Sequence, residues 1–340
     1  MTITSNPRSS ALEAVDLVKS YAVGRGKDPI CALNGLSFAA QTGTIFGLLG
    51  PNGAGKSTTV KILSTLARAD SGTAMVAGFD VASQPERVRQ AIGFVAQKPI
   101  SDPMDTGREN LVLAGQLHSM SKREARSRAD ELLDRFGLTE AADRLVGKYS
   151  GGMARKLDVA IGLMHRPQVL FLDEPTTGLD PEARAEMWAE IARMAKQEQM
   201  TILLTTHYLD EADKLADRLA IVDHGRIIVS GTPEELKSDL QGDAIQLEVE
   251  EPAFARTVLD RIGAVRDVTM DANLLRARVD NGAQALPVVL TALDDAGIHA
   301  RSATISRPSL DDVYLRYAGR AFGSVNGSAD TSNTNERSNA

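Results

Sequence analysis

The chain of 340 residues is 43% hydrophobic and carries a formal net charge of -7. This size predicts more than one domain, and the acidic balance without a long basic run leaves nucleic acid unexpected as a partner. The start lacks a signal-peptide pattern, no apolar stretch is long enough to span a bilayer, and one cysteine excludes an internal disulfide. We therefore expect a cytoplasmic protein.

Residues 11–240 alternate short apolar runs with helical stretches, which predicts an α/β domain. Helices are expected over 58–67, 181–196 and 209–219. The expected strands have the sequences GTIFGLLG (43–50), DSGTAMVAG (70–78), AIGFVAQ (91–97), QVLFLDE (168–174) and TILLTTH (201–207). The last two runs are apolar throughout, which is typical of a parallel sheet covered on both faces.

A helical subdomain is expected over about 106–165. Ser121 followed by Glu124 predicts a capping box at the start of a helix, and Gly137 should end that helix. Its apolar residues share one face: Ala125, Ala129, Leu132, Leu133 and Phe136.

The pattern changes after residue 243, and 244–318 is predicted to form a separate accessory α+β domain. Ile245, Leu247 and Val249 alternate with polar residues, as in a half-buried strand. The order of elements is β-α-β-β-α-β, a ferredoxin-like unit, with Gly263 and Gly297 expected as left-handed helix caps. The ends, 1–10 and 319–340, are predicted to be disordered.

The sequence GPNGAGKST (50–58) matches the phosphate-binding pattern G-x-x-x-x-G-K-[ST] between a predicted strand and a predicted helix. Its glycines allow backbone N–H groups to turn inward on phosphates, Lys56 would reach the β- and γ-phosphates, and Ser57 would bind Mg²⁺. An ordinary glycine turn that caps a helix is the alternative. The candidate nucleotide-binding residues are Gly50, Asn52, Gly53, Ala54, Gly55, Lys56, Ser57 and Thr58.

Two carboxylates end the strand at 168–174. Asp173 is placed to hold Mg²⁺, and Glu174 could act as the general base that polarises the attacking water. Acidic residues at a strand end are commonplace, but a phosphate-binding loop upstream favours the functional interpretation. Tyr21, Gln97 and His207 are weak signals when each is taken alone.

The order of these three residues around the stronger motifs favours a functional interpretation. Tyr21, GPNGAGKST, Gln97, YSGGM (149–153), VLFLDEP (169–175), GLD (178–180) and His207 together resemble the motif set of ABC-transporter ATPase subunits. The resemblance implies a P-loop NTPase fold, ATP and Mg²⁺ as ligands, and a head-to-tail homodimer that closes around two nucleotides.

The resemblance also implies roles for single residues. Tyr21 would stack on adenine, Gln97 would sense the γ-phosphate and Mg²⁺, and His207 would contact the γ-phosphate. Ser150, Gly151 and Gly152 would bind the nucleotide held by the other subunit, and Asp180 would link the two sites. Unlike the common L-S-G-G-Q form, this copy has Tyr149 and Met153 at its ends.

More narrowly, RKLDVAIGLM (155–164), LLTTHYLDEADKLADRLAIVDHGRII (203–228) and RPSLDDVYLRYAG (307–319) resemble the daunorubicin/doxorubicin-resistance ATP-binding proteins. That resemblance implies a subunit of a drug, antibiotic or lipid exporter, held on the cytoplasmic face of the membrane by a separately encoded permease. An importer subunit and a soluble, non-transport ABC ATPase are the alternatives. The region 244–318 has no catalytic cluster, and we expect it to modulate dimerisation or partner docking.

Overall fold

The computed structural model describes residues 10–22, 24, 28–240 and 242–319. Apart from Ser10 and Gly319, the ends predicted to be disordered lie outside these residues. The chain divides into two compact units, Met1–Thr232 and Pro233–Ala340. The second unit thus begins earlier than the expected boundary at residue 240, because α8 (Pro233–Ser238) packs against α11 (Leu310–Ala318).

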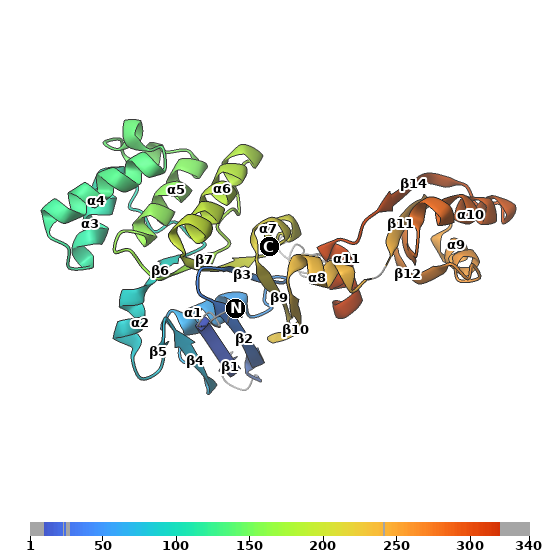
Figure 1. The fold of residues 1–340 in the computed structure, drawn as a ribbon, viewed down its shortest axis with the longest axis horizontal. Helices are drawn as coiled ribbons and strands as arrows, with labels where there is room; N and C mark the ends of the chain where they lie inside the picture. The colour runs from blue at the N-terminus through green and yellow to red at the C-terminus, as the bar shows by residue number, and fades with distance from the viewer. Residues whose placement is uncertain (1–9, 23, 25–27, 241, 320–340) are drawn as a thin grey trace, which may run out of the picture. The chain divides into compact units, whose positions relative to one another are not determined.

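A six-stranded sheet forms the centre of the first unit (Figure 1). Its strand order is β10-β9-β3-β8-β7-β6, and only β10 runs antiparallel to its neighbour. The strands are β3 (Ile45–Leu49), β6 (Ile92–Val95), β7 (Val169–Asp173), β8 (Thr201–Thr206), β9 (Arg218–Asp223) and β10 (Arg226–Gly231). β3, β7 and β8 are buried along their whole length, so the predicted parallel sheet with two covered faces is confirmed.

One face of this sheet packs against helices. Leu170 and Leu172 of β7 share a core with α6 (Pro181–Glu198) and with the predicted helical subdomain. That subdomain contains α3 (Gly107–Leu117), α4 (Lys122–Arg135) and α5 (Gly151–Gly162). The capping box of Ser121 and Glu124 is present, Gly137 is left-handed after α4, and all five apolar residues expected on one helix face are buried.

The other face is covered by α1 (Lys56–Leu63) and a four-stranded antiparallel sheet, which the sequence did not predict as a sheet. Its strands are β1 (Ser10–Tyr21), β2 (Ile30–Gln41), β4 (Ser71–Val76) and β5 (Phe79–Asp80). In β1 the buried residues do not keep a strict period of two, because Asp16 adopts a left-handed backbone at a register shift. This bulge hides the strand signal.

Two predicted helices of the first unit end early. The helix expected over 58–67 begins at Lys56 and ends at Leu63, before the left-handed Thr65. The helix expected over 209–219 is α7 (Leu209–Leu215), and β9 already begins at Arg218. Asp217 causes this change, since its backbone N–H and its carboxylate both bond to the backbone of Ile45 in β3. The short helix α2 (Pro85–Ala91) precedes β6.

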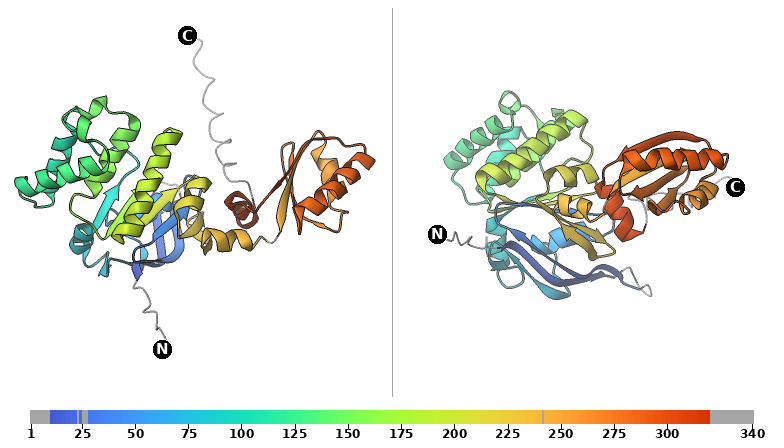
Figure 2. Two further views of the ribbon diagram at one scale, coloured as in Figure 1. Left: turned by 45° about the horizontal axis from the view of Figure 1, so that its top comes forward. Right: turned by 45° about the vertical axis from the view of Figure 1, so that its right-hand side comes forward.

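The second unit has the predicted β-α-β-β-α-β order, and Figure 2 shows its sheet with α10 lying along it. Its elements are β11 (Asp243–Val249), α9 (Pro252–Leu259), β12 (Val265–Asp271), β13 (Leu274–Val279), α10 (Gly282–Asp295) and β14 (Ala300–Ser306). The antiparallel strand order is β12-β13-β11-β14, and both helices share one core with the sheet. Gly297 is the predicted left-handed cap of α10, whereas the prediction for Gly263 was wrong because α9 ends at Leu259 and Gly263 has no positive φ.

Candidate functional site

The phosphate-binding loop leaves the end of β3 and turns into α1. Gly53 and Gly55 both have positive φ, and Gly55 directly precedes the first residue of α1. A Cβ at Gly55 would lie 2.6 Å from the carbonyl oxygen of Ala32, so only glycine fits this tight approach. The loop therefore presents backbone N–H groups at a helix N-terminus, which favours anions.

Lys56 lies within this loop with only 4% of its surface exposed. Its ammonium donates to the carbonyl oxygens of Gly50 and Pro51 at 2.6 and 3.0 Å, and it lies 3.9 Å from Glu174 Oε1. Burial lowers the pKa of Lys56, and the nearby carboxylates of Glu174 and Asp173 partly oppose that effect. A phosphate chain would supply the negative charge that this buried cation lacks.

Asp173 ends β7 beside the loop. Its Oδ1 accepts hydrogen bonds from Ser57 at 3.3 Å and from Thr205 of β8 at 2.5 Å. The two predicted magnesium ligands, Ser57 and Asp173, thus lie within hydrogen-bond distance of each other. A hydroxyl and a carboxylate are hard oxygen ligands, and Mg²⁺ takes few such protein ligands alongside phosphates and water.

Glu174 is the most constrained residue of the site. It is 8% exposed and has a left-handed backbone with φ of 49°, which is strained for a residue with a side chain. Gln97 donates to its Oε2 at 2.9 Å, Thr177 donates at 3.3 Å, and His207 Nδ1 lies 3.1 Å from the same oxygen. Two predicted residues from separate segments, Gln97 and His207, and the unpredicted Thr177 therefore meet at one carboxylate oxygen.

Arg155 of α5 connects the segments that carry these groups. Its buried guanidinium donates to the carbonyl oxygens of Ala96, Asp173, Glu174 and Pro175 at 2.6 to 3.2 Å. It thereby ties the residue before Gln97 to the end of β7. Burial is the main cause that lowers the pKa of this guanidinium below its usual value.

The turn at Ser150 opens α5 on the surface. Ser150 is the N-cap and its Oγ accepts from the backbone N–H of Met153 at 3.2 Å, while Gly151 has open space where a Cβ would stand. Ser150 and Gly151 are exposed. Tyr149 turns the other way, and its hydroxyl donates to the carbonyl oxygen of Ala141 at 2.8 Å. The turn is therefore an exposed helix start, and no lysine among the described residues lies within it as Lys56 does in the first loop.

Comparison with known proteins agrees with this geometry. The family model described as "ABC transporter" matches residues 33–177, and the model described as "ATP-binding protein DrrA1-3-like, C-terminal domain" matches residues 231–318. The daunorubicin resistance ATP-binding protein DrrA2 of Streptomyces coeruleorubidus is 49% identical over 313 residues, which cover 91% of this chain and 95% of that protein. The chain belongs to the daunorubicin-resistance group of ABC-transporter ATP-binding proteins.

Other relatives of this ATP-binding subunit have similar coverage. The daunorubicin/doxorubicin resistance ATP-binding protein DrrA of Streptomyces peucetius is 45% identical, over 91% of this chain and 92% of its own length. The linearmycin resistance ATP-binding protein LnrL of Bacillus subtilis is 38% identical, over 92% of this chain and 99% of its own length. The predicted family is confirmed, and the chain is an ATPase of that family.

Solved structures support the fold. CbiO1 from Clostridium perfringens, part of an ABC transporter complex, superposes with a TM-score of 0.61 at 26% identity, over 74% of this chain and 96% of CbiO1. The ATP-binding subunit of another ABC transporter gives a TM-score of 0.59 at 29% identity, over 68% of this chain and 93% of that subunit. The predicted ABC ATPase fold is thus confirmed. Within the described residues, no helix of the subunit is long and apolar enough to cross a bilayer.

Two predicted residues of the subunit lie on the surface. Tyr21 is the last residue of β1, 39% exposed, with Lys19 Nζ 5.5 Å from the centre of its ring. Asp180 is the exposed N-cap of α6 and accepts from the backbone N–H of Ala183 at 2.9 Å. Among the described residues, neither side chain is hydrogen-bonded to the carboxylates of the site, so their roles stay predictions.

Sequence reasoning missed Thr205, Thr177 and Arg155. Thr205 had a signal, because a hydroxyl in the otherwise apolar run TILLTTH needs a buried partner. Thr177 lies in a short loop whose path the sequence does not give. Arg155 reads as an ordinary charge on a helix, and only the packing of α5 shows that it is buried.

Proposed function

We propose that the chain is the ATP-hydrolysing subunit of an exporter. Two copies would hold two ATP·Mg²⁺ between them and bind a separately encoded permease at the cytoplasmic face of the membrane. The observation that carries this proposal is the convergence of Gln97, Thr177 and His207 on Glu174 beside the buried Lys56. A module that only bound nucleotide would not need this carboxylate.

Phosphate binding would begin with Lys56. Its ammonium now donates to two loop carbonyls, and these weak neutral acceptors are exchanged for phosphate oxygens when ATP enters. The backbone N–H groups around Gly53 and Gly55 and the start of α1 add positive potential. Tyr21, at the exposed end of β1, is the candidate for stacking on adenine.

Ser57 and Asp173 would hold the Mg²⁺ that accompanies ATP. Their oxygens already lie within hydrogen-bond distance, so both could serve one ion. Thr205 also donates to Asp173, which orients the carboxylate toward the loop. When bound, Mg²⁺ neutralises charge that develops on the phosphate oxygens.

Glu174 would act as general base. Water attacks the γ-phosphorus, the bond to the bridging oxygen of ADP breaks, and the proton of the water passes to the Glu174 carboxylate. Gln97 and His207 fix this carboxylate from two sides, and both could contact the γ-phosphate or its water. Arg155 would hold the backbone on which the base stands.

The second nucleotide contact would come from the partner subunit. The Ser150 turn is exposed at the start of α5, and it would donate N–H groups and a hydroxyl to the phosphates bound by the other copy. Asp180 would link the two sites. Since these contacts exist only in the closed dimer, ATP would shift the population toward closure and hydrolysis would release it.

The direction and cargo of transport are inferred from the relatives. Those proteins are named for resistance to daunorubicin, doxorubicin and linearmycin, and others for Nod factor export. These names favour efflux of an amphipathic antibiotic or lipid-like compound over uptake. The second unit would modulate dimerisation or docking of the permease.

The test is co-purification from membranes with the product of the adjacent gene, followed by measurement of which compounds stimulate ATP hydrolysis. We expect a stable complex whose ATPase rate rises with amphipathic compounds, and export from vesicles that a Glu174→Gln complex does not support. Uptake by cells that carry the pair would contradict export. ATPase activity stimulated by nucleic acid without a membrane partner would contradict the transport role.

A further inference from the structure

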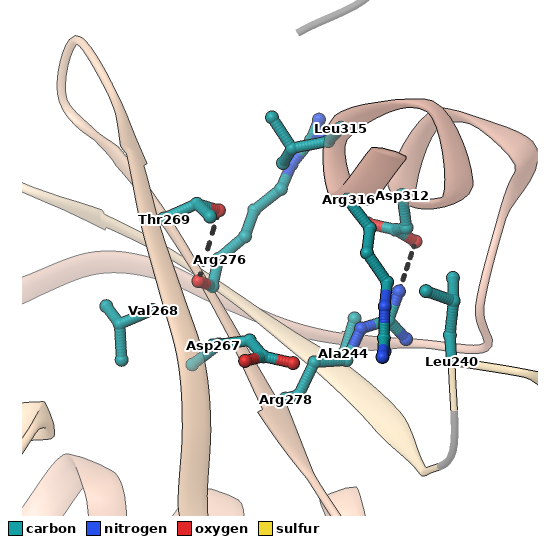
Figure 3. A pocket seen from close by; sticks show the side chains of 11 residues that line it. Leu240, Ala244, Asp267, Val268, Thr269, Arg276, Arg278, Asp312, Leu315 and Arg316 are labelled. Carbon is teal, nitrogen blue, oxygen red and sulfur yellow. Dashed lines mark hydrogen bonds and ion pairs between the residues drawn. The ribbon is translucent and has the colours of Figure 1, made fainter. Parts of the chain in front are cut away.

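The second unit contains a cavity of about 340 Å³ on the face of its sheet that α9 and α10 leave open. β12, β13 and α11 form most of its wall, and Figure 3 shows the residues that line it. Apolar surface comes from Leu240 and Leu315. The volume is at the lower end of the range for small organic ligands, about 300 to 1,000 Å³.

Two arginines that line the cavity, Arg276 and Arg278, use only part of their hydrogen-bonding capacity. Arg278 of β13 is 8% exposed, and its Nη1 is buried without a hydrogen-bond partner among the described residues. Arg276, two residues earlier on the same face, pairs with Asp311 at 2.5 Å but leaves its Nε unbonded. Figure 3 shows Arg316 of α11 reaching toward Arg278.

The one buried carboxylate nearby is already engaged. Asp312 Oδ2 lies 3.2 Å from Arg278 Nη2, and the same oxygen accepts from the backbone N–H and the hydroxyl of Ser309 as the cap of α11. Arg278 Nη1 has no hydrogen bond to it or to another described residue. A buried donor left without a partner costs free energy, so the site gains when an acceptor enters.

Asp267 also lines the cavity but differs in its surroundings. It is exposed, so water screens its charge, whereas the charge of Arg278 is hardly screened. The electrostatic preference of the inner cavity is therefore for an anion, weakened by the like charge at Asp267.

We propose that this cavity is a binding site for a small organic anion with one carboxylate and an apolar body. The carboxylate accepts from the guanidinium groups of Arg278 and Arg316, in the forked geometry that arginine offers. The apolar body lies against Leu240 and Leu315. The site is separate from the nucleotide site, since all its residues belong to the second unit.

The test is calorimetry on the full chain with ADP·Mg²⁺ at saturation, which blocks the nucleotide site. Naphthalene-2-carboxylate is the probe, and its neutral amide, naphthalene-2-carboxamide, is the matched ligand control. We expect saturable binding of the carboxylate and much weaker binding of the amide. Absence of saturable carboxylate binding, or equal binding of both compounds, would overturn the proposal.

Variants locate the site. Arg278→Gln should raise the Kd of the carboxylate about ten- to hundredfold, because a charge-assisted bond to a buried group is lost. Arg316→Gln, at an exposed residue that the fold does not need, should raise it about two- to fivefold. Arg261→Gln removes the same charge after α9, outside the cavity, and should leave the Kd within error.

Asp267→Asn should change the Kd of the carboxylate in the opposite direction to the two arginine variants of the cavity. Removing this like charge should lower the Kd of the carboxylate, whereas a ligand held through an ammonium group would bind less well. Circular dichroism and thermal unfolding check that each variant is folded, and Arg316→Gln decides the question if Arg278→Gln is not. Equal effects of Arg316→Gln and Arg261→Gln would sink the proposal, because general charge alone would then explain binding.

Discussion

The subunit has two glycine-rich turns that each open a helix, and their surroundings differ. The turn at residues 50–58 encloses the nearly buried Lys56 and lies beside two carboxylates. The turn at residues 150–152 is exposed at Ser150 and Gly151, and its serine does no more than cap α5. A glycine-rich helix start therefore lies among buried charged groups in one place and on the open surface in the other.

This difference suits a division of labour in which a helix start acts as a reaction site only when other segments bring charge to it. β7, β8 and the loop after β6 converge on the first turn, whereas no catalytic candidate among the described residues bonds to the second. If the proposed dimer is right, damage to the two turns should have separable effects on binding and on hydrolysis.

Glu174→Gln should have the largest effect on the first turn. Hydrolysis should fall about 10²- to 10⁴-fold, because the amide keeps the shape of the carboxylate but cannot take a proton. ATP binding should persist, since Lys56 and the loop are unchanged. Phosphate release at saturating ATP and equilibrium dialysis measure the two quantities, and near-normal turnover would refute the assignment of the base.

Ser150→Arg should damage only the second turn. We expect ATP binding by the monomer within about twofold of normal and hydrolysis reduced about 10²-fold or more, because phosphate contacts from the partner are lost. Sedimentation with ATP should show no dimer. Ser121→Arg is the matched control, since Ser121 caps α4 in the same way. If the Ser150→Arg protein still dimerises and hydrolyses ATP, residues 149–153 serve only as a helix cap.

Lys56→Ala should weaken ATP affinity about ten- to hundredfold through loss of charge-assisted hydrogen bonds. Lys61→Ala, at an exposed position of the same helix, serves as control and should bind ATP normally. Fluorescence titration with a labelled nucleotide measures both. Unaltered affinity in Lys56→Ala would contradict the phosphate cradle.

Arg155→Gln should lower kcat about tenfold with less effect on ATP affinity, because the segments that carry Gln97 and Glu174 lose their common anchor. Arg155→Lys should rescue only in part, since one ammonium cannot reach all four carbonyls. Lys156→Gln, which loses only a surface pair with Glu186, should keep normal kcat. Equal losses of kcat in Arg155→Gln and Lys156→Gln would contradict a positioning role of Arg155.

His165→Gln should have the smallest effect, on stability alone. Burial, followed by the charge of the stacked His118 ring at 3.7 Å, lowers the pKa of His165 from 6.5 to about 4. Between these values the unfolded chain binds a proton that the folded chain does not, so stability falls as pH falls from 6.5 to 4. The midpoint of urea unfolding should vary less across this pH range in His165→Gln than in the parent protein or in His299→Gln. An equal dependence on pH in all three proteins would contradict a role of His165.

The sequence predicted the parallel sheet and the ferredoxin-like unit because their signals are local. Buried strands such as β7 are apolar throughout, and β11 alternates strictly at Ile245, Leu247 and Val249. It did not predict the antiparallel sheet, since the bulge at Asp16 breaks the alternation in β1. The end of α7 was missed for a related reason, because a bond from Asp217 to β3 overrides helix propensity.

The site follows the same division. Lys56 and Asp173 were predictable because fixed spacing places them beside a strand end. The contacts of Arg155 and Thr177 depend on how α5 and the loop after β7 pack in three dimensions. No spacing rule contains that information.

The Tyr149 side chain fills the space beside Gly107, so the residues at these two positions constrain each other. A Cβ at Gly107, the first residue of α3, would stand 2.2 Å from the Tyr149 hydroxyl. Alanine at 107 is therefore compatible only with a shorter side chain at 149, such as the leucine of the common L-S-G-G-Q form. Positions 107 and 149 should accordingly co-vary as a pair across relatives, and a designer who restores leucine at 149 also gains freedom to stabilise α3.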